Sequence, residues 1–411
     1  MSYPASVLTT SRVQPMLFCL AAFVLAGCAF SVAQSEQTLF DFTKAAGVTP
    51  QAGLVADASG ALYGTTSWGG NGGLASWGGT VYKVTPPSAP GAAWTQTVLY
   101  SFTYDGENND GANPYCTLIF DSQGNLYGTT EHGGQSGNGT IFQLVPPSTS
   151  GGVWTENILA DVFDTPFAGL VMDAAGNMYG SGYGGDIFEL SPPTVAGGQW
   201  TVTPLASAGG YEYRSLILDG KGNLYGTTQT GGRYLQGSVF GVKPPTVAGG
   251  AWSLVTLHSF SNHETPMSSL ILVSGVLYGT TMFGGTNGQG TVFSLNPPTI
   301  AGQPWTLNTL YSFQGGSDGA QPEGGVIFGK GGALYGTTNV GGSANFGTVY
   351  KLTPPAIQGE PWTETILHSF TASGHDGELP ETNLILVKGN FYGTTKGGGN
   401  SATGTVFRVT P

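Results

Sequence analysis

The sequence predicts an all-β fold, a seven-bladed β-propeller of four-stranded blades. Three observations support this prediction. The phrase LYGTT, or a close variant of it, occurs seven times, with its tyrosine at Tyr63, Tyr127, Tyr179, Tyr225, Tyr278, Tyr335 and Tyr392. Each unit of about 50 residues contains four short apolar runs, which is the pattern of a propeller blade. The two ends of the array complete one another, so the units can form a closed ring.

Glycine and proline are abundant, at 69 and 25 of 411 residues, which in an aperiodic chain would suggest disorder. Here the glycines are periodic, since one stands three residues before each repeated tyrosine and another directly follows it. They separate short runs of Val, Ile, Leu, Phe and Tyr, which indicates strands joined by turns. With 39% hydrophobic residues, the chain can bury a sizeable core.

The four strands of a unit are recognised by their sequences. The first is typified by NPYCTLIFD at 113–121, the second is LYGTT, the third is typified by GTVYKLTPP at 347–355 and the fourth by WTETILHSF at 362–370. Pro-Pro pairs end the third strand, because proline cannot donate to a sheet ladder. Six tryptophans open the fourth strand, and we expect them to pack between blades: Trp94, Trp154, Trp200, Trp252, Trp305 and Trp362.

The turn between the first and second strands begins with an aspartate in four units, namely Asp57, Asp121, Asp173 and Asp219. An Asp at the start and a Gly at the end suit a tight hairpin, so we interpret these aspartates as structural. Calcium ligation is the alternative. It is disfavoured because the other units carry Val273, Gly329 and Val387 at the same place.

The ends of the array predict how the ring closes. Residues 36–42, EQTLFDF, form a strand of the fourth type with no unit before it, and residues 404–411, GTVFRVTP, form one of the third type with no unit after it. Pairing these two strands would complete the last blade. It would also cover a sheet edge that otherwise invites aggregation.

The first residues predict export. Residues 16–27 are an apolar run too short to span a bilayer and suited to a signal-peptide core. The run ends in Leu-Ala-Gly before Cys28, which resembles the bacterial lipobox, and this resemblance implies that Cys28 carries a lipid. We therefore predict a lipoprotein-type signal peptide at 1–27, a tether at 28–35 and one propeller domain at 36–411. An ordinary signal peptide with an incidental cysteine is the alternative.

The resemblance to a lipoprotein also implies a location. Ala29 after the cysteine favours the outer membrane by the sorting habit of that class, so the expected location is the cell envelope, as an outer membrane lipoprotein, or outside the cell. The repeats themselves resemble the GloVer type of the choice-of-anchor tandem-repeat proteins, a bacterial family marked by GNLYGTT, GG, GTVFKLTP and LYSF in this order. The resemblance covers 36–411 and implies a tethered repeat protein, without an established reaction or ligand.

The candidate binding face is the one that varies between units. The loops from the second to the third strand and from the fourth to the next first strand share that face and differ widely, whereas the opposite turns are monotonous. In six units a proline begins the first strand, and the next residue should lie near the mouth of the central channel. With the seventh unit these residues are Gln51, Tyr115, Phe167, Tyr213, Met267, Glu323 and Glu381, with Arg214 one position further on.

Aromatic side chains with a few polar groups are typical of a sugar or small-molecule site. The alternative is that these residues are merely half-exposed strand ends. Carboxylates gather on the same face, namely Asp105, Glu107, Asp110, Asp318, Glu323, Asp376, Glu378 and Glu381. They could hold calcium, but Asp-Gly is also a common turn sequence. The expectation is therefore no cofactor, with calcium as the alternative.

Other chemistry finds little support in the sequence. After Cys28 only Cys116 remains, so a thiolate metal site is excluded. His258 and His368 occupy a framework position that is Tyr100 or Tyr311 in other units, and no His-x-x-x-His or Walker motif occurs. With 12 basic against 24 acidic residues, nucleic acid is not expected as a partner.

The expected function is a lipid-anchored binding scaffold whose partners are the membrane and a carbohydrate or protein ligand. The alternative is an enzyme, a polysaccharide or small-lactone lyase or hydrolase with its site at the channel mouth, which rests on fold analogy alone. A purely structural envelope protein is the third hypothesis. A catalytic site would require polar residues from different blades to converge at the mouth, whereas a scaffold requires only surface.

Overall fold

A computed structural model describes residues 36–70, 78–89, 91–103, 110–149, 151–162, 164–195, 197–211, 214–247, 249–300, 302–357 and 359–411. The predicted signal peptide at 1–27, with Cys28, and the tether at 28–35 lie outside the described residues, as do Tyr213, Asp105 and Glu107. In the described part of the chain, no helix has the length and apolar character needed to cross a membrane.

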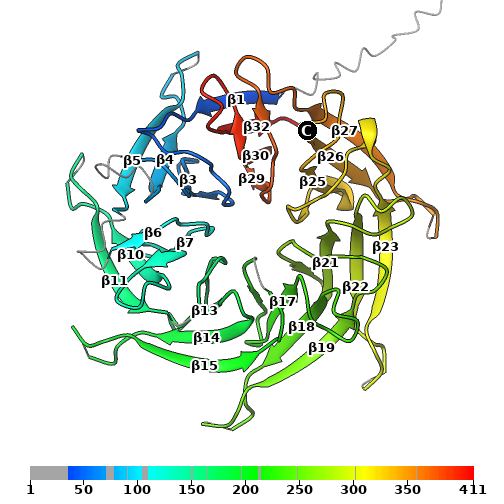
Figure 1. The fold of residues 1–411 in the computed structure, drawn as a ribbon, viewed down its shortest axis with the longest axis horizontal. Coiled ribbons are helices and arrows are strands. Elements are labelled where there is room, and N and C mark those ends of the chain that lie inside the picture. Colours follow the sequence, from blue (N-terminus) through cyan, green and yellow to red (C-terminus); the bar gives the residue numbers. More distant parts are fainter. Residues whose placement is uncertain are drawn as a thin grey trace, which may run out of the picture. The chain divides into compact units, whose positions relative to one another are not determined.

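Seven antiparallel four-stranded sheets stand in a ring around a central channel, which confirms the predicted propeller (Figure 1). Blade 1 contains β2 (Val55–Ala56), β3 (Leu62–Thr66), β4 (Thr80–Thr85) and β5 (Thr95–Ser101). Blade 2 contains β7 (Ile119–Phe120), β8 (Leu126–Thr129), β10 (Thr140–Val145) and β11 (Thr155–Asp161). Blade 3 contains β12 (Val171–Met172), β13 (Met178–Ser181), β14 (Asp186–Ser191) and β15 (Thr201–Ser207).

The remaining blades repeat the pattern. Blade 4 contains β16 (Ile217–Leu218), β17 (Leu224–Thr228), β18 (Ser238–Lys243) and β19 (Ser253–Ser259). Blade 5 contains β20 (Ile271–Val273), β21 (Val276–Thr281), β22 (Thr291–Asn296) and β23 (Thr306–Ser312). Blade 6 contains β24 (Ile327–Phe328), β25 (Leu334–Thr338), β26 (Thr348–Thr353) and β27 (Thr363–Ser369). Blade 7 contains β29 (Ile385–Val387), β30 (Asn390–Thr395), β32 (Thr405–Val409) and β1 (Glu36–Asp41).

The loops between these strands contain two short β-ladders and two 3₁₀ turns. Two small ladders pair β6 (Gly111–Ala112) with β9 (His132–Gly133), and β28 (Gly377–Glu378) with β31 (Gly397–Gly398). Two 3₁₀ turns, η1 (Gly316–Asp318) and η2 (Lys330–Gly332), precede and follow the first strand of blade 6.

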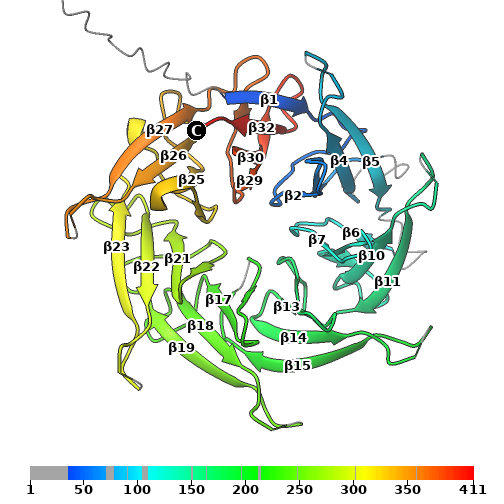
Figure 2. The same cartoon turned by 180° about the vertical axis from the view of Figure 1, so that it is seen from behind.

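The N-terminal strand closes the ring as predicted. β1 pairs antiparallel with β32, from Glu36 opposite Val409 to Asp41 opposite Thr405. Figure 2 shows the same arrangement from behind, with β1 on the outer edge of the last blade. The chain therefore leaves no blade with three strands, and the edge that β32 would present is covered.

The repeated tyrosine and the turn aspartate form one unit of structure. Asp57 accepts hydrogen bonds from the backbone N–H groups of Ser59 and Ala61, at 2.9 and 3.0 Å, and from the Tyr63 hydroxyl at 3.0 Å. Burial alone would raise the pKa of the Asp57 carboxyl, but these hydrogen bonds outweigh it and hold the pKa below its usual value. The same contacts recur at Asp121, Asp173 and Asp219. The interpretation of these aspartates as turn residues is thus confirmed.

Threonine joins one blade to the next. The first threonine of LYGTT donates its hydroxyl to a carbonyl at the start of the following blade, as from Thr65 to Cys116 at 3.1 Å and from Thr394 across the closure to Ala52 at 3.2 Å. The other donors of this kind are Thr129, Thr227, Thr280 and Thr337. Blade 3 has Ser181 instead, and its buried hydroxyl has no hydrogen-bond partner.

The tryptophans pack between blades as expected. Trp94 of blade 1 lies 6.0 Å from Tyr392 of blade 7, and Trp252 of blade 4 lies 5.8 Å from Tyr179 of blade 3, measured between ring centroids. Each tryptophan therefore covers the repeated tyrosine of the preceding blade.

Acid pairs lie between blades at the outer strands. Tyr100 donates its hydroxyl to Glu156 at 2.9 Å, across the boundary from blade 1 to blade 2, and burial together with the charge of Asp110 raises the pKa of Glu156 to about 8. At the boundary from blade 5 to blade 6, burial and the neighbouring Asp318 raise the pKa of Glu364 to about 9. Each pair therefore holds a proton at neutral pH.

We predict that the propeller loses stability in alkali. Because the folded-state pKa values of Glu156 and Glu364 lie above the ordinary value of 4.5, their favourable contribution is complete below that value and is lost as the pH rises through about 8 to 9. Glu156→Gln and Glu364→Gln keep a donor for the neighbouring aspartate, so each should stabilise the protein by about 1 kcal/mol at pH 9. Denaturation midpoints between pH 5 and 10 would measure this, with the exposed Glu360→Gln as control. Equal alkaline losses in all four proteins would contradict the prediction.

Candidate ligand site at the channel mouth

A cavity of about 720 Å³ lies at the mouth of the central channel, on the face formed by the variable loops. It gathers seven of the eight predicted site residues, namely Gln51, Tyr115, Phe167, Arg214, Met267, Glu323 and Glu381. The eighth, Tyr213, lies outside the described residues. Thr49, Trp68, Asn339 and Lys396 complete the lining.

In six blades a proline begins the first strand, and we call it the mouth proline because the residue after it lies near the mouth. The backbone of the residue before this proline helps to place the side chains that line the mouth. In four blades this residue has a left-handed backbone, with φ values of 61° at Thr49, 56° at Asn113, 56° at Gln321 and 56° at Leu379. Such a conformation is costly for a residue other than glycine and persists only where contacts hold it. The N–H group of Leu379 donates to Phe346 of blade 6 at 2.9 Å, and its carbonyl accepts from the Lys396 N–H at 3.1 Å.

This second hydrogen bond explains which other residues reach the mouth. It places the residue that follows LYGTT beside the residue that follows the proline, so Lys396 lies beside Glu381, and Asn339 lies beside Glu323 in the same way. The sequence analysis missed Asn339 and Lys396. The signal was present, because the residue directly after the constant phrase differs from unit to unit.

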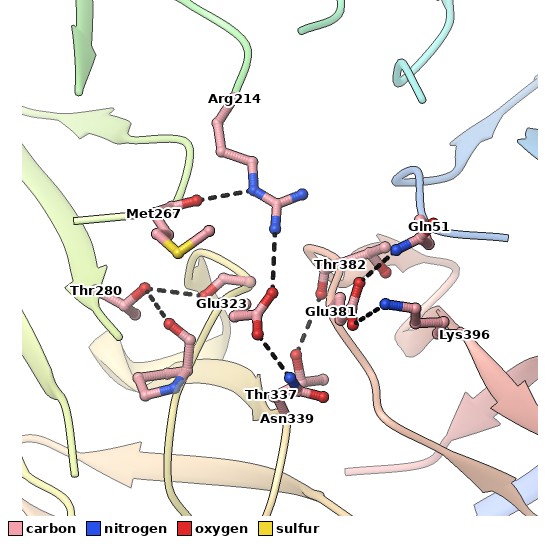
Figure 3. A network of polar contacts seen from close by, with 12 residues as sticks. Gln51, Arg214, Met267, Thr280, Glu323, Thr337, Asn339, Glu381, Thr382 and Lys396 are labelled. Carbon is pink, nitrogen blue, oxygen red and sulfur yellow. Dashed lines mark hydrogen bonds and ion pairs between the residues drawn. The ribbon is translucent and has the colours of Figure 1, made fainter. Parts of the chain in front are cut away.

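Charged side chains from several blades meet on one side of the mouth (Figure 3). Glu323 accepts a hydrogen bond from the Asn339 amide at 2.6 Å and lies 3.8 Å from the Arg214 guanidinium, whose Nε donates to the Met267 carbonyl at 2.8 Å. Glu381 accepts from the Gln51 amide at 2.8 Å and from the Lys396 ammonium at 3.0 Å. We call these six side chains, with the Met267 carbonyl, the mouth network.

The mouth network balances its own charge. Two cationic side chains face two carboxylates, and both carboxylate residues are only 8% exposed. Burial raises the pKa of Glu323, and the charge of Glu381 adds to this, while Arg214, Asn339 and Lys396 oppose it. An ionic ligand would have to break these pairs, whereas a neutral polar ligand can use their remaining donors and acceptors.

Aromatic rings form the other side of the mouth. Tyr115 and Phe167 lie 5.7 Å apart between centroids, and Phe167 lies 5.3 Å from Tyr183. Tyr183 stacks on Tyr211 at 4.5 Å and 20°. We call these four rings the aromatic arm. It leads from the mouth to a second cavity of about 790 Å³ whose lining includes Tyr183, Tyr211, Gln229, Asn262, His263 and Phe283.

The mouth is separated from the other end of the channel by a narrow polar layer. Thr117 accepts from the Gly53 N–H at 3.1 Å, and Ser215 accepts from the Gly169 N–H at 3.0 Å, so side chains of one blade satisfy the backbone of the blade before it. The space here is about 30 Å³, which holds about one or two water molecules. Beyond it lies an apolar cavity of about 1230 Å³ with Ile119 and Ile217 in its lining.

The acidic residues that the sequence analysis grouped on one face lie in several different places in the structure. Glu323 and Glu381 line the mouth, whereas Asp110, Asp318 and Asp376 lie where one blade meets the next. Glu378 lies in the short strand β28. The described members of this set are therefore distributed over several places, and the mouth holds two of them.

Comparison with known proteins gives a family and a fold. The family model described as the Gloeobacter/Verrucomicrobia repeat matches residues 25–211 and 212–411. None of the curated protein sequences matches the chain. The solved structure of YCF48 from Cyanidioschyzon merolae is similar, with 12% identity and a TM-score of 0.50, over 92% of this chain and 99% of that one.

Two further solved structures are similar. The extracellular domain of a protein assigned to a hybrid two-component system of B. thetaiotaomicron has 11% identity and a TM-score of 0.52, over 92% of this chain and 41% of that one. A gluconolactonase of Xanthomonas campestris has 12% identity and a TM-score of 0.42, over 92% and 89%. At 11% identity and a TM-score of 0.52, the first of these structures shows a shared propeller fold alone.

We predict that the mouth network depends on its guanidinium. Replacing Arg214 by methionine removes the cation beside Glu323, so the pKa of Glu323 should rise further and the variant should be less stable by about 1–3 kcal/mol at pH 8. The loss should shrink at pH 4, where protonation removes the buried charge. Urea unfolding at both pH values measures this, with the exposed Arg233→Met as matched control. A loss of equal size at both pH values would contradict the electrostatic explanation.

Proposed function

The chain belongs to the family of the Gloeobacter/Verrucomicrobia repeat, and from its channel mouth we propose that it is a saccharide-binding protein. The observation that carries this proposal is the pairing, in one cavity, of two rings of the aromatic arm, Tyr115 and Phe167, with a polar network that balances its own charge. Sugars present apolar C–H faces that stack on aromatic rings and hydroxyls that hydrogen-bond to polar side chains.

Size and shape support the same ligand class. The mouth cavity of about 720 Å³ is within the common range of small-molecule pockets. The space within the polar layer below it, about 30 Å³, is far smaller than the mouth cavity. We infer that the end of a neutral oligosaccharide enters the mouth and that the following sugar units lie over Tyr183 and Tyr211 toward the second cavity.

A second candidate function is cleavage of such a ligand, by a polysaccharide or small-lactone lyase or hydrolase. The observation in its favour is Glu323, a buried carboxyl whose raised pKa suits a general acid, in the same cavity as Glu381. Both carboxylates are, however, held by donors: Glu323 by Asn339 of its own blade, and Glu381 by Lys396 of its own blade and by Gln51 of the neighbouring blade. This favours binding over turnover.

We also propose that the protein is exported and held at the outer membrane by a lipid on Cys28. The support is the apolar run 16–27 followed by Leu-Ala-Gly and the cysteine. A propeller on a short tether would present its variable face to ligands outside the inner membrane. A protein ligand or a purely structural role in the envelope would use the same location.

The saccharide proposal predicts a specific effect of the aromatic arm. A protein lacking residues 1–28 should bind neutral glycans on an array, and Phe167→Ala and Gln51→Ala should each weaken binding of the best glycan by about tenfold or more. Tyr234→Ala, an exposed ring outside the lining of both cavities, is the matched control.

The array experiment separates the candidate functions. Binding without breakdown supports the binding protein, whereas breakdown that Glu323→Gln abolishes without loss of binding supports the enzyme. Absence of glycan binding, or equal weakening by Tyr234→Ala, would contradict the saccharide proposal.

The anchor proposal predicts that Cys28 determines how the protein partitions. The wild-type protein, expressed in a bacterium, should enter the detergent phase of a Triton X-114 extract, and Cys28→Ala should move it to the aqueous phase. Cys116 is buried in blade 2, so Cys116→Ala serves as a matched cysteine control that should stay in the detergent phase. Detergent partitioning of Cys28→Ala would contradict lipidation at this residue.

A further inference from the structure

Three potential metal ligands meet where the N-terminal strand joins blade 6. Glu36 lies in β1, His368 in β27 and Asp376 in the loop that follows β27, and their ligand atoms all lie within 4.8 Å of one another. His368 Nε2 and Asp376 Oδ1 are 3.1 Å apart. The cluster is partly buried and joins two segments more than 300 residues apart in sequence.

The cluster is a modified copy of the two acid pairs found elsewhere in the ring. His368 pairs with Val349 in the same register in which Tyr311 pairs with Val292, and Glu36 pairs with Val409 as Glu364 pairs with Leu352. At the tyrosine boundaries, a hydroxyl donates to the carboxylates and one carboxyl keeps a proton. At this boundary an imidazole nitrogen, which can bind a metal ion, takes the place of the hydroxyl.

The fold itself does not explain a histidine beside two carboxylates. His258 occupies the same register position in blade 4, opposite Val239, but the next blade carries Leu307 where Glu36 and Glu364 stand. Both histidines pack edge-on against a phenylalanine, at 4.9 Å for His258 and 4.7 Å for His368. Both histidines therefore have the framework role that the sequence predicted. Only His368 of these two has the carboxylates of Glu36 and Asp376 beside it.

Hydrogen bonds orient the Asp376 carboxylate of the cluster, and a cavity gives access to the cluster. Asp376 Oδ2 accepts from the Thr371 N–H at 2.7 Å and from its hydroxyl at 2.8 Å, which fixes the carboxylate with Oδ1 toward His368. Such outer-shell hydrogen bonds are typical of metal ligands. A cavity of about 620 Å³, lined by Glu36, Asp376 and their neighbours in β1, opens at the cluster.

We propose that Glu36, His368 and Asp376 bind one divalent transition-metal ion of the zinc class. One imidazole nitrogen and two carboxylate oxygens are ligands that such ions accept, at about 2.0–2.2 Å. In a tetrahedral site these atoms would be about 3.4 Å apart, so small movements of the side chains from their present separations would suffice. The two carboxylates neutralise the ion, and the cavity leaves a fourth position for water.

The metal would act on the closure of the ring. Glu36 is the first residue of β1, the strand that completes blade 7, and the other two ligands belong to blade 6. An ion held by all three ties the closing strand to the neighbouring blade. Metal binding should therefore stabilise the folded ring, since the ligands are together only when the ring is closed.

The test uses the untagged full chain and the metal ion alone. After chelation and buffer exchange, one equivalent of Co²⁺ should give the visible absorption of a tetrahedral site, and Zn²⁺ should displace it and raise the melting temperature. His368→Tyr restores the residue found at the two sister boundaries, so it should fold normally and bind at least about tenfold more weakly. Asp376→Asn should weaken binding as well.

Two further variants separate this cluster from its surroundings. His375 pairs with Asp41 nearby, so His375→Ala should leave Co²⁺ binding unchanged if the proposed ligands are correct. Tyr311→His places an imidazole beside Asp318 and Glu364 and should add a second equivalent of bound Co²⁺. The proposal is overturned if the wild-type chain binds no Co²⁺, if His368→Tyr binds as tightly as wild type, or if only His375→Ala abolishes binding. A Tyr311→His protein that binds no more than wild type would contradict the register argument.

Discussion

The hydrogen bond from the first threonine of LYGTT to the next blade is the contact on which the ring depends. A single four-stranded sheet cannot bury both of its faces, so each blade is stable only against its neighbours. The threonine hydroxyl fixes that neighbour at the inner end of the blade, and the tryptophan of the following blade covers the tyrosine of the same phrase further out. The phrase recurs because both contacts are built on it. Blade 3 keeps the tyrosine but leaves the Ser181 hydroxyl without a partner.

The side chains of LYGTT make the contacts between blades, so this phrase changes little from unit to unit. The residues that differ between units stand beside it. In the six blades that have a mouth proline, the carbonyl of the residue before this proline brings together the residue after LYGTT and the residue after the proline. Neither position carries a contact that the ring requires, so each blade can contribute a different side chain. Blades 2 and 3 contribute Tyr115 and Phe167, and blades 6 and 7 contribute Glu323 and Glu381, whereas blade 4 contributes Arg214 from one position further on. An asymmetric site thus arises on a symmetric scaffold.

The features that recur in every unit could be predicted from the sequence. The side-chain contacts between particular residues of different blades could not. Blade number, closure by residues 36–42 and the group of residues around the mouth followed from register, which counting along the chain reveals. The bond from Gln51 to Glu381, 330 residues apart, joins the adjacent blades 1 and 7 at the closure of the ring and depends on how far the two side chains reach. His368 was assigned to the framework correctly, but its carboxylate partner Glu36 belongs to the strand that arrives from the other end of the chain. Register within one unit contains no information about such partners.

The polar layer in the channel has a consequence for how a ligand can be bound. Its glycines allow close approach of neighbouring blades, since a Cβ on Gly53 would lie 2.8 Å from the Thr117 hydroxyl oxygen. The layer therefore cannot widen without loss of the hydrogen bonds between blades. A ligand at the mouth meets a rigid polar floor and must find its apolar contacts at the side, where Phe167 and Tyr183 lie. This geometry favours an elongated ligand that enters at one end and continues along the aromatic arm, and it disfavours one that threads the ring.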